Sequence, residues 1–185
     1  MITISLENGD TIIIDDKRTS SKESFDVSDM EQWNITPYEK VGSIKFGDSR
    51  DKIRKLCGEF KEFNKTKDSK NSTDDFKLFH VYYDESNKCK AIEFFKNKDT
   101  NIFINGINIF NETFDSLKSK LKSKNVKEDK TSFIFNDFGF SVYSPEKKDI
   151  ETILVFSKGY YGNKSQESLD LTDLKYQMGE RCLWC

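Results

Sequence analysis

Few side chains in this sequence could carry out acid–base or nucleophilic chemistry. His80 is the only histidine among 185 residues, and a histidine base requires a nucleophile and an orienting group beside it. Two pairs of carboxylates, Asp74-Asp75 and Asp84-Glu85, could perform the acid–base chemistry of glycosidases. Both pairs fall in predicted turns, where acidic residues are common for conformational reasons. We therefore assign no catalytic residue.

The cysteines and glycines predict neither a metal site nor a cofactor. Cys57 and Cys89 fall in predicted secondary structure and are expected to act as small apolar residues in a reducing cytosol. Cys182 and Cys185 form a C-x-x-C pair, but a redox pair would open a helix and zinc would require two more ligands. The sequence also lacks a glycine-rich phosphate loop and a dinucleotide fingerprint.

The composition argues against nucleic acid and membranes as partners. The net charge is −2, which argues against a nucleic-acid-binding protein that depends on phosphate contacts. No apolar run approaches the roughly 18–20 residues that cross a bilayer, and residues 1–10 lack the features of a signal peptide. Sixteen Phe and seven Tyr supply bulky core material. We expect a folded cytoplasmic protein without a membrane or nucleic-acid partner.

One stretch of the chain recurs. Residues 79–95 return sixty-one positions later as residues 140–156. The identical pairs at that offset are Phe79 and Phe140, Val81 and Val142, Tyr82 and Tyr143, Glu85 and Glu146, Ile92 and Ile153, and Phe95 and Phe156. Each copy predicts two strands around a polar turn. We interpret the chain as a duplicated unit.

The N-terminal part predicts a hairpin, a polar arm and a short helix. Ile2, Ile4 and Leu6 alternate with polar residues, and Asn8-Gly9 favours a type I′ turn, so Met1–Asp15 is expected to form a hairpin. Residues 15–28 are too polar to pack. A capping box at 28–31 predicts a helix through Trp33.

The first unit predicts a strand, a helix and a loop before the hairpin. Val41–Phe46 is strand-like, and Ser49 is an expected helix N-cap. The apolar residues on one helical face are Ile53, Leu56, Cys57 and Phe60. Gly58 is expected to end this helix, and residues 61–75 to form a loop.

The second unit repeats this order. Residues 102–109 are strand-like, with a tight turn at Asn105-Gly106, and three strands are expected at 132–136, 139–144 and 150–157. A longer helix carries the apolar stripe Phe110, Phe114, Leu117 and Leu121. At the same offset Leu56 meets Leu117 and Ile53 meets Phe114, so the duplication includes the helix.

Alternation along the strands separates two faces of the predicted sheet. The pairs Phe79/Phe140, Val81/Val142, Ile92/Ile153 and Phe94/Val155 are apolar in both copies and should pack against the helices. The pairs on the other face are His80/Ser141, Tyr82/Tyr143, Ala91/Thr152, Glu93/Leu154 and Phe95/Phe156.

We expect this second face to be open and to bind a protein, because large aromatic side chains suit binding surfaces. The predicted contact residues are Tyr82, Tyr143, Phe95, Phe156 and His80, with Asp84, Glu85 and Glu146 in acidic turns at the rim. Such a rim would favour a basic partner. The alternative is that the N-terminal hairpin or the tail covers this face and its aromatic residues form a second small core.

Residues 44–58, IKFGDSRDKIRKLCG, carry a resemblance to a known family. This segment resembles the strand-Gly-x-Ser-helix-Leu-x-Gly opening of the beta-lactamase-inhibitor-protein-like fold. The resemblance implies a helical segment before a small antiparallel sheet, and in the inhibitor proteins two such units occur in tandem. The sequence lacks the signal peptide and disulfide spacing of the secreted inhibitors. It is similar in this respect to cytoplasmic immunity proteins, which implies a bacterial toxin as partner.

The expected fold is α+β: tandem helix-plus-antiparallel-sheet units form one continuous open sheet, preceded by a β-hairpin. The expected divisions of this single compact domain are residues 1–40, 41–98, 99–158 and 159–185. The leading functional hypothesis is a non-catalytic immunity protein that occludes the active site of a toxin, such as a basic nuclease. The alternatives are an enzyme using Asp and Glu chemistry at the sheet surface, or an assembly or structural factor.

Overall fold

The computed structural model describes residues 2–5, 11–14, 33–65, 69–128, 130–146 and 148–161, the first two ranges by their backbone alone. Strands β1 (Ile2–Ser5) and β2 (Thr11–Ile14) pair antiparallel, with Ile2 opposite Ile14. The predicted N-terminal hairpin is therefore confirmed. Its turn at Asn8-Gly9, the arm at 15–28 and the tail from residue 162 onward lie outside the described residues.

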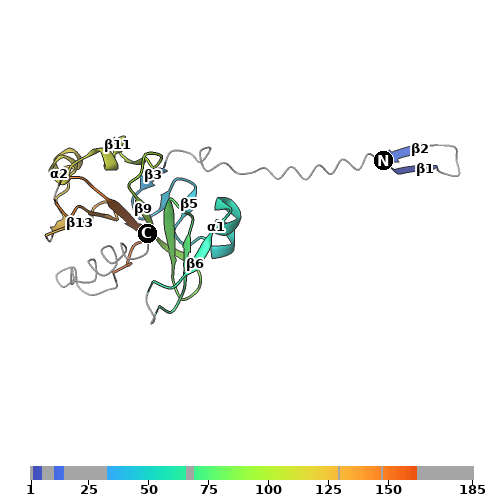
Figure 1. Ribbon diagram of the computed structural model, residues 1–185, viewed down its shortest axis with the longest axis horizontal. Coiled ribbons are helices and arrows are strands. Elements are labelled where there is room, and N and C mark those ends of the chain that lie inside the picture. Colours follow the sequence, from blue (N-terminus) through green and yellow to red (C-terminus); the bar gives the residue numbers. More distant parts are fainter. Residues whose placement is uncertain are drawn as a thin grey trace.

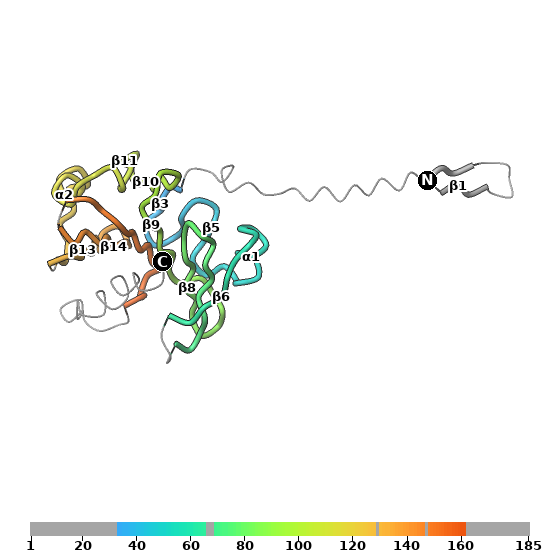
Figure 2. The backbone as a smooth tube through the Cα atoms, in the orientation of Figure 1, coloured from blue at the N-terminus to red at the C-terminus, as the bar shows by residue number. Residues whose placement is uncertain are grey.

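The largest element is an open, eight-stranded antiparallel sheet. In spatial order its strands are β12 (Val126–Glu128), β13 (Ser132–Phe135), β14 (Phe140–Tyr143), β15 (Thr152–Phe156), β9 (Cys89–Phe95), β8 (Phe79–Tyr83), β7 (Thr73–Asp75) and β6 (Lys61–Phe63). The strands expected from the repeated segments are thus all present, and Figure 2 shows β13 with β14 and β8 with β6 on either side of β9.

The two repeated segments meet at the centre of this sheet. Strand β15 pairs antiparallel with β9, and Leu154 lies opposite Glu93. On either side of this pair, Thr152 lies opposite Phe95 and Phe156 lies opposite Ala91. The pairing is therefore symmetric about two residues that are sixty-one positions apart.

A second, five-stranded sheet was not expected. Its strands are, in order, β11 (Ile107–Asn108), β10 (Ile102–Ile104), β3 (Trp33–Thr36), β4 (Lys40–Val41) and β5 (Ile44–Lys45). Strand β3 runs parallel to β10, and the other neighbours are antiparallel. The expectation of a single continuous sheet is wrong, because β3 joins two small hairpins into a sheet of their own.

Two turns explain how these hairpins form. Asn105 and Gly106 both have positive φ, 49° and 76°, as the predicted tight turn requires. The strand predicted over Val41–Phe46 is wrong, because the chain reverses at Gly42, where φ is 54°. The helix predicted to end at Trp33 is also wrong at that residue, which begins β3 instead.

The described residues form two short α-helices. Helix α1 (Arg50–Cys57) begins after Ser49, whose side chain accepts a hydrogen bond from the Lys52 amide, and ends at Gly58 with φ 80°. Both predictions are confirmed. Helix α2 (Phe114–Leu121) is capped by Thr113 and is also eight residues long, so the longer helix predicted from Phe110 is wrong. Phe110 lies in the preceding 3-10 turn η2 (Ile109–Asn111).

Three strands lie in polar segments that were expected to be loops. Residues 61–75 contain β6 and β7, and the lysine-rich segment after α2 contains β12. Strands β6 and β12 form the two edges of the large sheet. Edge strands carry charged residues that discourage pairing with other chains, so they lack the apolar alternation that identifies inner strands. The loop prediction for 61–75 is therefore wrong at both strands.

The main core lies on one face of the eight-stranded sheet. The helices and the five-stranded sheet both contribute to it, and Ile53 in α1 and Leu117 in α2 are fully buried. Trp33 of β3 makes edge contacts with Phe79 and Phe94, at centroid distances of 4.9 and 5.0 Å. All eight residues predicted for the apolar face belong to this core. Figure 1 shows α1 beside β5 and β6, and α2 near β11 and β13.

Candidate functional site

The second face of the sheet carries a smaller aromatic cluster, as the sequence predicted. Its buried members are Tyr82, Ala91, Ile134, Leu154 and Phe156, and Tyr38, Tyr143, Tyr160 and Tyr161 pack against them. Phe156 contacts the rings of Tyr160 and Tyr161 at 5.6 and 5.1 Å. Tyr38 reaches the cluster because Gly139 has no Cβ; an added Cβ would lie 2.8 Å from the Tyr38 ring.

This face is less open than expected. Tyr82, His80 and Phe156 are only 8, 8 and 3% exposed, so the expectation that they line an open surface is wrong. Tyr143 and Phe95 are half-buried. The aromatic rings of this face pack on one another and on tyrosines from outside the repeated segments, which corresponds to the alternative of a second small core.

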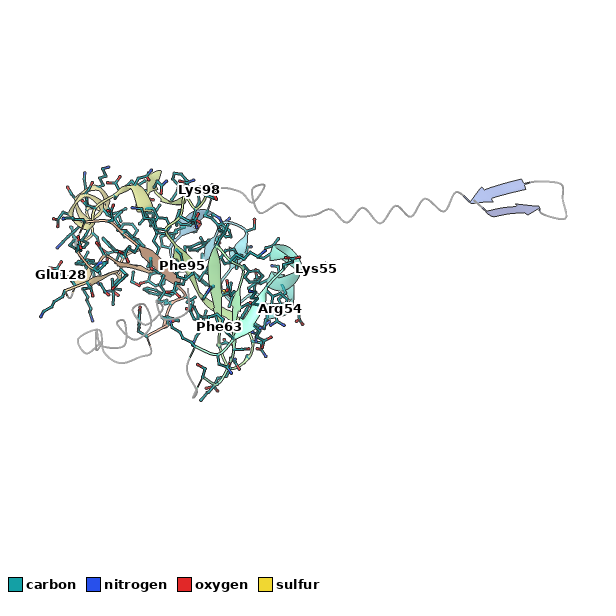
Figure 3. All side chains as sticks on the ribbon, in the orientation of Figure 1. Arg54, Lys55, Phe63, Phe95, Lys98 and Glu128 are labelled. Atoms are coloured by element: carbon teal, nitrogen blue, oxygen red, sulfur yellow. The ribbon has the colours of Figure 1, made fainter. Side chains whose placement is uncertain are left out.

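The predicted rim residues do remain at the surface. Asp84 and Glu85 are exposed in the turn between β8 and β9, and Glu146 is exposed after β14. Glu85 is paired with Lys70, and Glu146 lies 3.7 Å from Lys148. The structure thus brings Tyr82 and Glu85 to one pocket, while Phe95, the central residue labelled in Figure 3, lies on the neighbouring strand.

A polar contact lies within the aromatic cluster. The Glu93 carboxylate, 1% exposed, accepts a hydrogen bond from the Tyr82 hydroxyl. The Lys65 ammonium group donates to the same hydroxyl at 3.2 Å and lies 4.8 Å from the Tyr82 ring. Burial, together with nearby Tyr161 and Glu93, raises the pKa of Tyr160 above its usual value. This chain of groups gives the face a defined polar centre.

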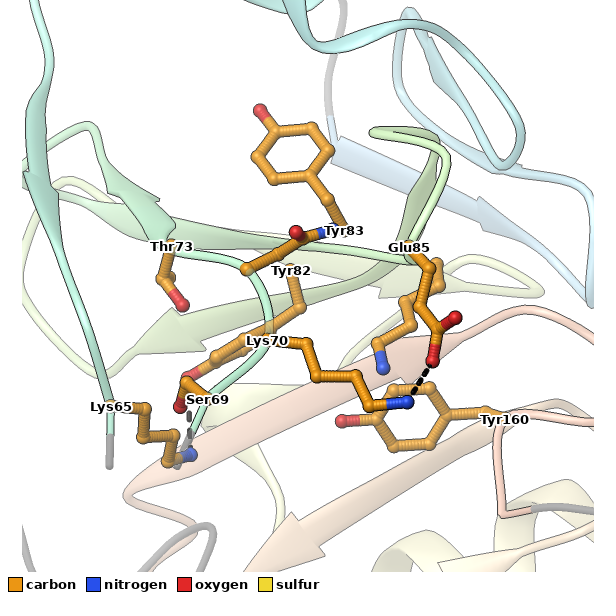
Figure 4. Close-up of a pocket in the computed structure, with 10 residues that line it drawn as sticks. Lys65, Ser69, Lys70, Thr73, Tyr82, Tyr83, Glu85 and Tyr160 are labelled. Carbon is orange, nitrogen blue, oxygen red and sulfur yellow. Dashed lines mark hydrogen bonds and ion pairs between the residues drawn. The ribbon is translucent and has the colours of Figure 1, made fainter. Parts of the chain in front are cut away.

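A pocket of about 340 Å³ opens beside Tyr82. Figure 4 shows Lys65, Lys70, Glu85 and Tyr160 among its lining residues, and the Lys70 ammonium group donates to the Glu85 carboxylate. The lining residues are Lys65, Ser69, Lys70, Asn71, Thr73, Tyr82, Tyr83, Glu85, Lys90 and Tyr160. The pocket therefore combines ammonium groups, hydroxyls and aromatic rings.

His80 lies in an aromatic setting. Its ring is 4.9 Å from Phe63 and 5.0 Å from Phe95, and its Nε2 lies 3.3 Å from Asp75. Three polar or aromatic neighbours hold the imidazole in place across β6, β7 and β9. This packing accounts for a histidine at this position by structure alone.

A separate charged network fastens α1 to the sheet. The Asp74 carboxylate, 0% exposed, binds Arg50 and Arg54 at 2.7 Å each and accepts from the Tyr83 hydroxyl at 2.9 Å. Glu62 of β6 binds Arg54 at 2.8 Å. Figure 3 shows Arg54 next to β6. The other cationic groups of α1, including Lys55, are exposed. The network links α1 to the sheet, and both oxygens of the Asp74 carboxylate already accept hydrogen bonds within it.

The two described cysteines behave as predicted. Cys57 and Cys89 are free and buried, and burial raises the pKa of the Cys57 thiol to about 12. Cys182 and Cys185 lie outside the described residues. Within the described ranges, no group of three His, Cys, Asp or Glu side chains is placed to hold a metal ion.

The lysines of the pocket are not predicted from the sequence. Lys65 and Lys70 lie in a segment predicted as a solvated loop, and Lys90 should by alternation point to the core. Tyr160 lies in residues 159–185, outside the two predicted units. A cluster of lysine and tyrosine residues drawn from four separate segments has no local signal, so only the tertiary structure identifies it.

The Tyr82 hydroxyl is expected to contribute to stability. Tyr82→Phe leaves the buried Glu93 without this donor, and we expect the free energy of unfolding to fall by about 1–3 kcal/mol. Tyr143→Phe, at the equivalent but half-buried position, should change it by less than about 0.5 kcal/mol. Urea denaturation of the two variants measures both values. Equal effects would contradict a specific role for the Tyr82–Glu93 hydrogen bond.

No protein-family model, curated protein or solved structure matched this chain. In the part of the chain that the structure describes, no helix has the length and apolar character to cross a bilayer. The candidate site therefore consists of the aromatic second face, its buried Tyr82–Glu93 centre and the adjoining lysine-lined pocket.

Proposed function

We propose that this chain is a non-catalytic binding protein that neutralises a bacterial toxin by occluding its active site. The observation that carries the proposal is the large open sheet with helices on one face and an aromatic cluster on the other. Tandem units of that kind are what the resemblance at residues 44–58 implies. The same resemblance suggests an immunity protein that acts in the cytoplasm.

A tandem duplication is part of this proposal. The order hairpin, helix and four antiparallel strands occurs twice, once from β4 to β9 and again from β10 to β15. The two sets of four strands join where Glu93 lies opposite Leu154, its equivalent at the sixty-one-residue offset. A duplicated unit that pairs with its own copy would produce such symmetric pairing.

The burial of individual residues refines the proposed contact surface. Tyr82, Phe156 and His80 are buried, so they are assigned to supporting the surface from below. Half-buried Tyr143 and Phe95 supply the accessible aromatic area. Asp84, Glu85 and Glu146 provide polar contacts at the rim, where charge placement governs encounter and specificity more than affinity.

The proposal is tested by protection of cells. The proteins encoded by the genes beside this one are each expressed with and without the chain, and the survival of the cells is measured. Co-expression should restore growth, and the purified proteins should form a complex without any turnover by this chain. Failure to protect against the toxins encoded by neighbouring genes would overturn the proposal.

Substitution of Tyr143 provides a second test, on the purified complex. Tyr143→Ala removes a half-buried ring of the proposed surface, and we expect the free energy of binding to weaken by about 2 kcal/mol or more. Lys55→Ala is the control, because Lys55 is exposed on α1, which covers the opposite face. Calorimetry measures both, with unfolding curves to separate binding from stability. An equal loss in the control variant would place the interface elsewhere.

A further inference from the structure

The pocket beside Tyr82 has an excess of positive charge. Three lysines and one glutamate line it, which leaves a formal excess of two positive charges. The glutamate, Glu85, binds Lys70 at the rim. The Lys90 ammonium group lies 5.5 Å from the Tyr160 ring on the pocket side of the sheet. Ammonium groups that converge around a partly enclosed space favour an anionic ligand.

A β-bulge directs Lys90 into this pocket. Tyr82 lies opposite Ala91, but Tyr83 lies opposite Cys89, so Lys90 is the extra residue on β9. Because of this shift Cys89 packs in the main core, whereas Lys90 lines the pocket on the other face. Strict alternation would give the reverse arrangement. Bulges commonly redirect a side chain beside a functional site.

The lysine at the β-bulge is found in only one of the two repeated segments. The residue sixty-one positions after Lys90 is Glu151, which is exposed. Glu151 directly precedes β15, whereas Lys90 lies within β9. The lysine of the pocket therefore has no basic counterpart at the sixty-one-residue offset.

We propose that this pocket binds the phosphate or carboxylate group of a small molecule. Lys65, Lys70 and Lys90 supply the positive charge for the oxyanion, and the rings of Tyr82 and Tyr160 line the space for an apolar part of the ligand. The volume of about 340 Å³ lies within the range of small-molecule sites. This site is a further activity and does not depend on a toxin partner.

Three small molecules that each contain a benzene ring test whether the pocket prefers an oxyanion. Phenyl phosphate, benzoate and benzyl alcohol are titrated into the full chain while the backbone amide signals of Asn71 and Lys90 are followed by NMR. The two anions should shift these signals saturably, and the relative affinities identify which oxyanion is preferred. Equal binding of benzyl alcohol, or no saturable shift up to about 10 mM of either anion, overturns the proposal.

Two variants should change the affinity in opposite directions. Lys90→Met should weaken binding of the preferred anion about tenfold or more, as expected for loss of a charge-assisted contact. Glu85→Gln should strengthen it, because it removes the negative charge that Lys70 binds. Lys96→Met is the matched control, because Lys96 follows the same strand and pairs with Asp149 outside the pocket. Equal loss in Lys90→Met and Lys96→Met would show non-specific charge attraction only and would refute the site.

Discussion

Replacement of Asp74 by alanine is expected to lower the free energy of unfolding by about 3–5 kcal/mol. The carboxylate is fully buried and binds two guanidinium groups, and it also accepts a hydrogen bond from Tyr83. Removing it leaves Arg50 and Arg54 without their shared anion in a partly buried position. Loss of one partner from a buried network costs far more than the network contributes in total, because the remaining charge is uncompensated.

The control for Asp74→Ala is a carboxylate whose ion pair is exposed. Glu59 lies 3.6 Å from Lys77, and both side chains are mostly exposed. Glu59→Gln should therefore change the free energy of unfolding by less than about 1 kcal/mol. Guanidinium-induced unfolding measures the two variants under identical conditions. Similar losses from both would mean that Asp74 is no more than a surface charge.

The contribution of Asp74 should depend on pH. Burial alone would raise the pKa of this carboxyl, but hydrogen bonds from Arg54, Arg50 and Tyr83 lower it below its usual value. The folded protein therefore holds the proton on Asp74 less tightly than the unfolded chain does. In the unfolded chain the pKa of an Asp carboxyl is about 3.9. The stabilisation is complete above that pH and is lost as the pH falls through the folded value. The difference between wild type and Asp74→Ala should shrink accordingly below about pH 4.

Elements with a local chemical signal could be predicted from the sequence. The turn at Asn105-Gly106 and the helix boundaries at Ser49 and Gly58 depend on side chains or glycines at fixed positions, and all are confirmed. The inner strands of the repeated segments are predictable for a related reason, because apolar and polar residues alternate along each of them. Strand β3 is not predicted because it pairs with β10, far along the chain. Strands β6 and β12 are not predicted because they are charged edge strands without apolar alternation.

The candidate site likewise has features that the sequence predicts and features that it does not. Alternation placed Tyr82 and Glu93 on the second face correctly, because it operates within a single strand. It could not indicate that tyrosines 38, 160 and 161 pack over that face. Strict alternation would also place Lys90 on the core face, but one extra residue in a β-bulge reverses the pattern there. Burial and pocket formation depend on which distant segments meet, and no periodicity within a strand records this.

The sixty-one-residue offset that aligns the strands does not align the two helices. This difference changes which helix residues are expected to be buried. The sixty-one-residue offset pairs Leu56 with Leu117. The helix caps, however, are Ser49 and Thr113, which are sixty-four residues apart. Counting from the caps pairs Ile53 with Leu117, and both of these side chains are fully buried. Leu56 is half-buried at the edge of the core.

Ile53→Ala and Leu117→Ala are therefore each expected to lower the free energy of unfolding by about 2–5 kcal/mol, as large-to-small substitutions in packed cores do. Leu56→Ala should cost less than either, because a half-buried side chain loses less apolar contact and water can enter the space it leaves. Thermal and urea unfolding of the three variants test this order. If Leu56→Ala cost as much as Leu117→Ala while Ile53→Ala cost little, the helices would follow the sixty-one-residue offset. Their packing on the sheet would then differ from the arrangement described by the caps.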